Sequence, residues 1–183
     1  MGLRSAVFID RDGTLTLERE YLSDPASVRI APGAIDALSH LKEAGFALVI
    51  VTNQSGIACG YYTLEDYQAV AARVDEVLED AGVPVDMTLY CPHHPDITGS
   101  CPCRKPRTGM YLEAAQELDL DPSRSFYVGD KLKDVLPALE LGGQGLLVRT
   151  GYGRQFETSA PDSVVVVDDL DAAGKVILGE TWR

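Results

Sequence analysis

The chain has 183 residues, of which 45% are hydrophobic and 24% charged, and its formal net charge at pH 7 is −12. These values fit one globular domain over residues 1–183 and exclude a disordered chain, collagen-like repeats and a small disulfide scaffold. A strongly negative surface repels nucleic acids and anionic lipids, so we expect a small-molecule substrate, no nucleic-acid or membrane partner, and a monomer.

Short apolar segments alternate with longer amphipathic segments along the chain. The apolar segments predict strands buried on both faces, at residues 6–9, 47–51, 87–90, 125–128 and 146–148. The amphipathic segments predict helices at residues 34–44, 63–81, 108–118 and 134–141. Thr63 and Asp66 are spaced as in a capping box, and Gly45 is placed to cap the first helix. This alternation predicts an α/β fold, a Rossmann-like parallel sheet with helices on both faces.

Polar residues follow the predicted strands where each strand ends. In open parallel sheets, ligands bind beyond the carboxyl ends of the strands, so we expect these residues to form one site. They occupy residues 10–14, 52–56 and 129–134, together with 104–106 before a helix.

Asp10 and Asp12 come directly after the first strand, with Gly13 to turn the chain. Two carboxylates this close repel each other unless a cation lies between them. Mg²⁺ prefers hard oxygen ligands, and Asp130 at another strand end is placed to supply a further one. Each aspartate alone could instead cap a helix or a loop. The Gly-Asp-x-x-x-Asp sequence at residues 129–134 favours the magnesium interpretation.

Four segments resemble, in order, the four motifs of the haloacid dehalogenase superfamily of phosphotransferases: residues 8–14, Thr52-Asn53, Lys105, and Gly129-Asp130 through Asp134. The resemblance implies a capless haloacid dehalogenase fold and a phosphatase that forms a covalent aspartyl phosphate. It implies that Asp10 is the nucleophile and that Asp12 is the general acid and base. It also implies that Asp10, the backbone carbonyl of Asp12 and Asp130 hold Mg²⁺, while Thr52 and Lys105 bind the phosphoryl oxygens.

Three of the four cysteines lie close together in the segment 91–109. Cys91, His93, Cys101 and Cys103 offer three thiolates and one imidazole, a set that suits a closed tetrahedral Zn²⁺ site with a structural role. His94 is the alternative imidazole, and free buried cysteines are the alternative to a metal. In a reducing compartment such a cluster is more often a metal site than a set of disulfides. We therefore expect a zinc-binding loop at residues 91–109.

The zinc loop followed by Arg104-Lys105-Pro106 resembles a narrower group within the superfamily. These are small bacterial phosphatases that act on D-glycero-D-manno-heptose 1,7-bisphosphate or on histidinol phosphate. Residues 18–21, 52–58 and 149–153 favour the heptose branch, whose reaction removes the C7 phosphate. One departure is Cys59, where that family usually has Arg; we assign Cys59 no ligand role.

The expected substrate contacts come from four parts of the chain. We expect Arg104, with its rigid fork of donors, to bind sugar hydroxyls or the retained C1 phosphate. The full set is Asp10, Arg11, Asp12, Glu18, Arg19, Glu20, Tyr21, Thr52, Asn53, Gln54, Ser55, Arg104, Lys105 and Lys131.

Two other functions are compatible with parts of this pattern. Histidinol-phosphate phosphatase is the alternative within the same chemistry. A catalytically silent zinc-binding interaction module is the alternative of a different class, and the intact set of Asp10, Asp12, Lys105 and Asp130 argues against it. A nucleic-acid 3′-phosphatase is disfavoured by the acidic composition and the lack of a basic stripe.

Two features of the sequence bear on the compartment. No window holds the 18 or so consecutive apolar residues of a membrane-spanning helix. The apolar run at residues 6–9 is too short for the core of a signal peptide. We therefore expect a cytoplasmic protein.

Overall fold

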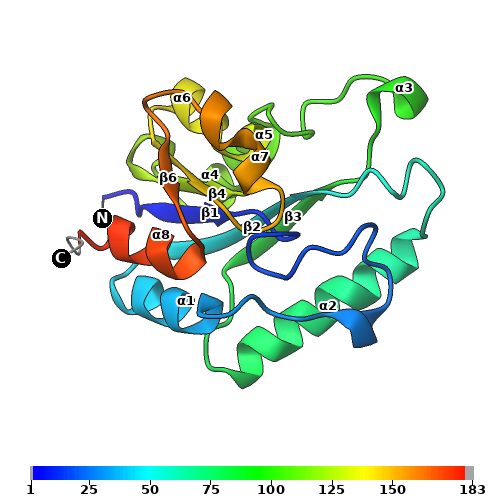
Figure 1. The fold of residues 1–183 in the computed structure, drawn as a ribbon, viewed down its shortest axis with the longest axis horizontal. Helices are drawn as coiled ribbons and strands as arrows, with labels where there is room; N and C mark the ends of the chain where they lie inside the picture. Colours follow the sequence, from blue (N-terminus) through cyan, green and yellow to red (C-terminus); the bar gives the residue numbers. More distant parts are fainter. Residues whose placement is uncertain (1, 180–183) are drawn as a thin grey trace.

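A six-stranded parallel sheet forms the centre of the computed structural model, which describes residues 2–179 (Figure 1). The strand order β3-β2-β1-β4-β5-β6 is that of a doubly wound fold, which confirms the predicted α/β class. The strands are β1 (Ala6–Ile9), β2 (Ala47–Asn53), β3 (Met87–Cys91), β4 (Phe126–Gly129), β5 (Gln144–Val148) and β6 (Val165–Val167).

Helices cover both faces of the sheet. One face carries α1 (Ala34–Glu43), α2 (Leu64–Asp80) and α8 (Leu170–Ile177), and the other carries α4 (Gly109–Glu117), α5 (Leu132–Val135), α6 (Pro137–Leu141) and α7 (Gly153–Phe156). The short helix α3 (Pro95–Thr98) lies in the predicted zinc loop, and 3₁₀ turns occur at Pro25–Ser27, Pro122–Arg124 and Glu157–Ser159. The capping box predicted at the start of α2 is confirmed, because Thr63 and Asp66 exchange side-chain to backbone hydrogen bonds.

The central strand β1 is buried on both faces, as its sequence predicts. Val7 and Ile9 belong to the core that α1, α2 and α8 cover. Phe8 belongs to the opposite core, where its ring stacks on Tyr127 with the centroids 5.0 Å apart and meets Tyr111 edge-on. This double burial fixes the position of the residues that follow Ile9.

Several predicted elements differ from the structure. The predicted helix at 134–141 starts two residues earlier and is two helices, because Pro137 has no N–H for the helical ladder. Strand β3 is an edge strand and only partly buried, so the prediction that it is buried on both faces is wrong. Strand β6 and helix α8 were not predicted. Gly174 in α8 permits close packing, since a Cβ there would lie 3.3 Å from that of Ala37.

The strand order places a crevice beyond the carboxyl ends of β1 and β4. The chain winds outward from β1 to β3 and then returns to place β4 on the other side of β1. Ile9 pairs with both Ile50 and Val128, so β4 ends close to the end of β1, whereas β2 continues past it to Asn53. Ligands bind at this point in doubly wound folds. None of the helices within residues 2–179 is long and apolar enough to cross a membrane.

Candidate active site

A buried cluster of one lysine and three aspartates lies beyond the ends of β1 and β4. Ligand oxygens of Asp10, Asp130 and Asp134 all lie within 4.8 Å of one another. The ammonium of Lys105 contacts Asp10 Oδ1 at 2.7 Å, Asp134 Oδ1 at 2.8 Å and the carbonyl oxygen of Val51 at 2.6 Å. Burial alone lowers the pKa of Lys105, but the charges of Asp10 and Asp134 outweigh it and raise that pKa. Lys105 is therefore a permanent cation that neutralises part of the acidic cluster.

Asp130 is fully buried, and one of its oxygens lacks a donor. Its Oδ2 accepts the backbone N–H of Tyr152 at 2.8 Å, whereas Oδ1 accepts no hydrogen bond from the described residues. Burial, together with the negative charge of Asp10, raises the pKa of Asp130 to about 7. Gly13, with φ +88°, lets the chain pass this carboxylate, because a Cβ there would lie 2.5 Å from Oδ2. A buried, unpartnered carboxylate oxygen of this kind fits a cation ligand.

Asp12 is oriented by two neighbouring side chains. Arg11 donates from Nε and Nη2 to the two oxygens of Asp12 at 3.0 and 2.9 Å. Gln54 donates to Asp12 Oδ2 at 2.8 Å and to Thr52 Oγ1 at 2.8 Å. Tyr62 in turn donates its hydroxyl proton to Gln54 Oε1 at 2.6 Å, which fixes the orientation of that amide. The carbonyl oxygen of Asp12 accepts no hydrogen bond from the described residues, so it is free to bind a cation.

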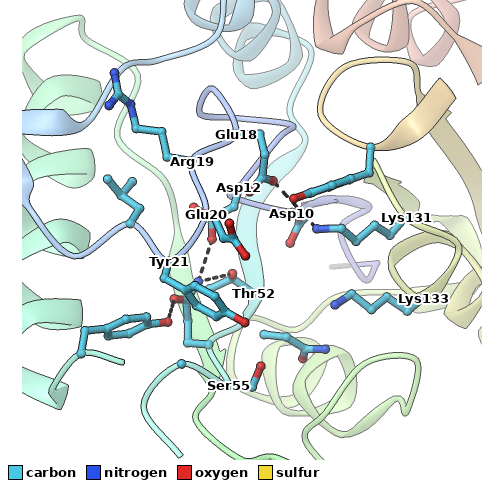
Figure 2. Close-up of a pocket in the computed structure, with 16 residues that line it drawn as sticks. Asp10, Asp12, Glu18, Arg19, Glu20, Tyr21, Thr52, Ser55, Lys131 and Lys133 are labelled. Atoms are coloured by element: carbon cyan, nitrogen blue, oxygen red, sulfur yellow. Dashed lines mark hydrogen bonds and ion pairs between the residues drawn. The ribbon is translucent and has the colours of Figure 1, made fainter. Parts of the chain in front are cut away.

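A cavity of about 260 Å³ opens beside this cluster (Figure 2). Its size suits a small molecule rather than a polymer. Most of the residues that the sequence assigned to the substrate line it: Asp10, Asp12, Glu18, Arg19, Glu20, Tyr21, Thr52, Asn53, Gln54, Ser55 and Lys131. Because Thr52 Oγ1 accepts from Gln54, its own hydroxyl proton is free to be donated to a ligand.

Three of the expected substrate contacts lie outside the lining of the cavity. Arg11 is buried against the ring of Tyr67 and bonded to Asp12. Arg104 donates to the carbonyl oxygen of His93 at 2.9 Å, and the third, Lys105, lies beneath Asp10. Asn53 lines the cavity, but its amide is bonded to the backbone N–H and C=O of Lys105 and so positions that residue.

Sequence reasoning missed four residues of the site. It quoted Asp134 and Tyr152 within motifs but gave them no role, and it did not consider Lys133 or Tyr62. The spacing of Asp130 and Asp134 was a usable signal, whereas Tyr62 and Tyr152 are brought in by loops that no local pattern reveals.

Lys131 lies 3.9 Å from Glu18 Oε2 and 3.8 Å from Asp130 Oδ1, with its ammonium over the ring of Tyr152.

The second metal-binding group lies in the loop after β3. The ligand atoms of Cys91, His93, Cys101 and Cys103 all lie within 4.8 Å of one another. Cys103 Sγ is 3.1 Å from Cys91 Sγ and 3.3 Å from both Cys101 Sγ and His93 Nδ1. Tetrahedral zinc with Zn–S bonds of about 2.3 Å requires ligand separations of about 3.8 Å, so a small expansion of this cluster accommodates the ion.

The neighbouring histidine is used differently. His94 is the residue before α3, and its Nδ1 accepts the backbone N–H of Asp96, so the structure places His93 and not His94 with the cysteines. Burial and the two neighbouring thiols raise the pKa of Cys103 well above its usual range. A cation is therefore needed to hold the Cys103 thiol as the thiolate that zinc binds.

Comparison with known proteins agrees with this geometry. A family model described as "HAD-hyrolase-like" matches residues 102–173. The D-glycero-beta-D-manno-heptose-1,7-bisphosphate 7-phosphatase of Photorhabdus laumondii is 42% identical over 181 residues, which cover 95% of this chain and 95% of that protein. The Yersinia pestis protein of the same name is 45% identical over 152 residues, covering 80% of this chain and 81% of that one.

A solved structure is similar over the whole fold. It is the D,D-heptose 1,7-bisphosphate phosphatase from B. bronchiseptica complexed with magnesium and phosphate, with a TM-score of 0.87, 32% identity, and coverage of 98% of this chain and 100% of that one. These matches place the fold and its acidic site in the haloacid dehalogenase class of hydrolases. Within that class, the chain belongs to the family of heptose 1,7-bisphosphate 7-phosphatases, which are phosphoric monoester hydrolases.

Proposed function

We propose that this enzyme removes the C7 phosphate of D-glycero-D-manno-heptose 1,7-bisphosphate in a Mg²⁺-dependent reaction that proceeds through a phosphorylated Asp10. The observation that carries the proposal is the buried cluster of Asp10, Lys105, Asp130 and Asp134 at the floor of a small-molecule cavity. Relatives that cover most of the chain carry the name of this activity, which supports the choice of substrate.

In the first step, a carboxylate oxygen of Asp10 attacks the phosphorus atom of the ester. A P–O bond forms to Asp10 while the bond to the leaving oxygen of the sugar breaks. Asp12 gives its proton to that oxygen, so the sugar leaves as an alcohol. Arg11 and Gln54 hold the Asp12 carboxyl group at the cavity. Thr52 donates its free hydroxyl proton to a phosphoryl oxygen.

In the second step, water attacks the phosphorus atom of the aspartyl phosphate. Asp12, now ionised, accepts a proton from the water, and the P–O bond to Asp10 breaks to release inorganic phosphate. Arg11 holds the Asp12 carboxyl group through two hydrogen bonds in this step as well. The ammonium of Lys105 contacts the Asp10 carboxylate directly and so holds the nucleophile in place.

Two metal ions suit the two donor groups. Asp10, Asp130 and the carbonyl oxygen of Asp12 are hard oxygen donors that would hold Mg²⁺, which would neutralise charge on the phosphoryl group. Cys91, His93, Cys101 and Cys103 would hold Zn²⁺ as a closed structural site. Since Arg104 bonds to the carbonyl oxygen of His93 and directly precedes Lys105, the zinc loop would also position the catalytic lysine.

A panel of substrates tests the proposal. Phosphate release is measured with Mg²⁺ on heptose 1,7-bisphosphate, histidinol phosphate and several sugar monophosphates, and ³¹P NMR shows which phosphate is lost. We expect the highest kcat/KM on the bisphosphate, with loss of the C7 resonance only. A higher kcat/KM on histidinol phosphate would instead support the alternative activity, and no turnover of any monoester would support a silent binding module.

A further inference from the structure

The lysines around the cavity differ in how many contacts their ammonium groups make with other protein groups. The ammonium of Lys105 is surrounded by three protein oxygens within 2.8 Å. Its N–H groups donate to Asp10 Oδ1 and to the carbonyl oxygen of Val51, and its charge is also paired with Asp134. Lys131 lies between two carboxylates and a tyrosine ring. Both residues therefore serve mainly to neutralise the acidic groups of the protein.

Lys133 differs from these two lysines in its contacts. It lines the same cavity as Asp10 and Thr52, and it is partly buried. Within residues 2–179 it has no hydrogen-bond or ion-pair partner. In Figure 2, Lys131 and Lys133 extend toward the cavity from the same side, opposite Tyr21, whereas the guanidinium of Arg19 points away from Asp10. Removing an ammonium from bulk water without giving it a partner is costly, so a site of this kind suits an anionic ligand.

The position of Lys133 indicates which part of the ligand it contacts. It lies in the first turn of α5, directly before Asp134, and the carboxylate of Asp134 contacts the same ammonium as Asp10 does. The first turn of α5 therefore lies at the Asp10 end of the cavity. Three carboxylates there face two lysines, Lys105 and Lys131, that are already paired with protein carboxylates. A phosphate dianion adds two negative charges, so the net charge of the site stays negative even when a divalent cation is bound.

We propose that Lys133 binds the phosphoryl group that Asp10 attacks, with its ammonium donating to a non-bridging oxygen. This inference rests on the proposed function, because it presumes that a phosphate monoester is bound at Asp10. It gives a binding role to a residue that the sequence analysis left without one. A charge-assisted hydrogen bond of this kind strengthens both substrate binding and the binding of inorganic phosphate.

The test compares Lys133→Met and Lys133→Arg with the wild type, and Lys175→Met on α8 serves as a control lysine far from the cavity. The readouts are the Kd of inorganic phosphate by calorimetry in the presence of Mg²⁺, and kcat/KM on heptose 1,7-bisphosphate and on 4-nitrophenyl phosphate. Thermal unfolding checks the fold, and Lys133→Gln replaces the Met variant if that variant does not fold.

We expect Lys133→Met to weaken phosphate binding about tenfold or more and to lower kcat/KM on both substrates by about tenfold to a hundredfold. Lys133→Arg should restore both values to within about threefold, which a purely structural role would not predict. Values unchanged within about twofold would overturn the proposal, as would a loss confined to the bisphosphate, which would assign Lys133 to the retained phosphate. The calorimetry decides the role of Lys133 even if heptose 1,7-bisphosphate proves not to be the substrate.

Discussion

Replacing Lys105 with Met should destabilise the protein strongly. Lys105 is 2% exposed, and its ammonium lies between Asp10 and Asp134, which are 8% and 2% exposed. The substitution keeps the length and the apolar stem of the side chain but leaves two buried carboxylates and the carbonyl oxygen of Val51 without their donor. Removing one partner of a buried ion pair costs about 3–5 kcal/mol. For a domain of this size, that corresponds to a fall in Tm of about 6–20 °C.

The assay is thermal and urea unfolding at pH 7.5, followed by circular dichroism. Lys175→Met is the control, because its exposed pair with Asp171 should contribute less than about 1 kcal/mol. The double variant Lys105→Met with Asp134→Asn should recover part of the lost stability, since it removes one of the two uncompensated charges. Added Mg²⁺ should recover more of it. A Lys105→Met protein within about 1 kcal/mol of the wild type would refute this account of the cluster.

Three further predictions concern Asp130, the zinc loop and Arg104. In metal-free protein, the pKa of Asp130 is about 7 in the folded state and about 4 in the unfolded chain. The free energy of unfolding should therefore fall as the pH rises between these values, by at most about 1.4 kcal/mol per pH unit. In the variant Asp130→Asn, this fall should be smaller. Elemental analysis should find about one zinc per chain. Structural zinc binds with an apparent free energy of about 10–16 kcal/mol, so its removal by a chelator should disorder the loop and abolish activity. A zinc-free preparation that stays folded and active would contradict the assignment. The substrate contact that the sequence predicts for Arg104 would make Arg104→Ala raise KM for the bisphosphate more than it lowers kcat, with little effect on a small monophosphate. Equal losses on both substrates would contradict that contact and would agree with the bond of Arg104 to the carbonyl oxygen of His93, next to Lys105.

The sequence predicts the elements whose patterns are local and strong. Strand β1 and the capping box of α2 are examples, because buried apolar runs and Thr63 with Asp66 are recognisable from neighbouring residues alone. Helix α8 was missed although its signal is local, because Asp169 caps it and the buried residues Leu170, Ala173 and Ile177 follow helical spacing. Strand β6 also left a usable signal, because the valine run at residues 164–167 is typical of a strand.

The site divides in the same way. The residue types of the acidic cluster and of the zinc loop can be predicted, because their spacing expresses the chemistry of the ligands. The partner of each side chain cannot be predicted, because it depends on contacts between distant segments. Arg11 bonds to Asp12 and lies over the ring of Tyr67, which a distant part of the chain, α2, supplies. Lys133 lines the cavity from α5, together with residues that follow β1 and β2.

The most direct test of the central claim, that Asp10 is the nucleophile of a phosphatase, is the turnover of Asp10→Asn. The two side chains are nearly the same size, so the variant should fold and keep its zinc, which unfolding and metal analysis would verify. With Mg²⁺ and heptose 1,7-bisphosphate present, we predict that phosphate release falls by more than about a thousandfold, because an amide oxygen cannot form the aspartyl phosphate. Phosphate release within tenfold of the wild type would contradict the covalent mechanism.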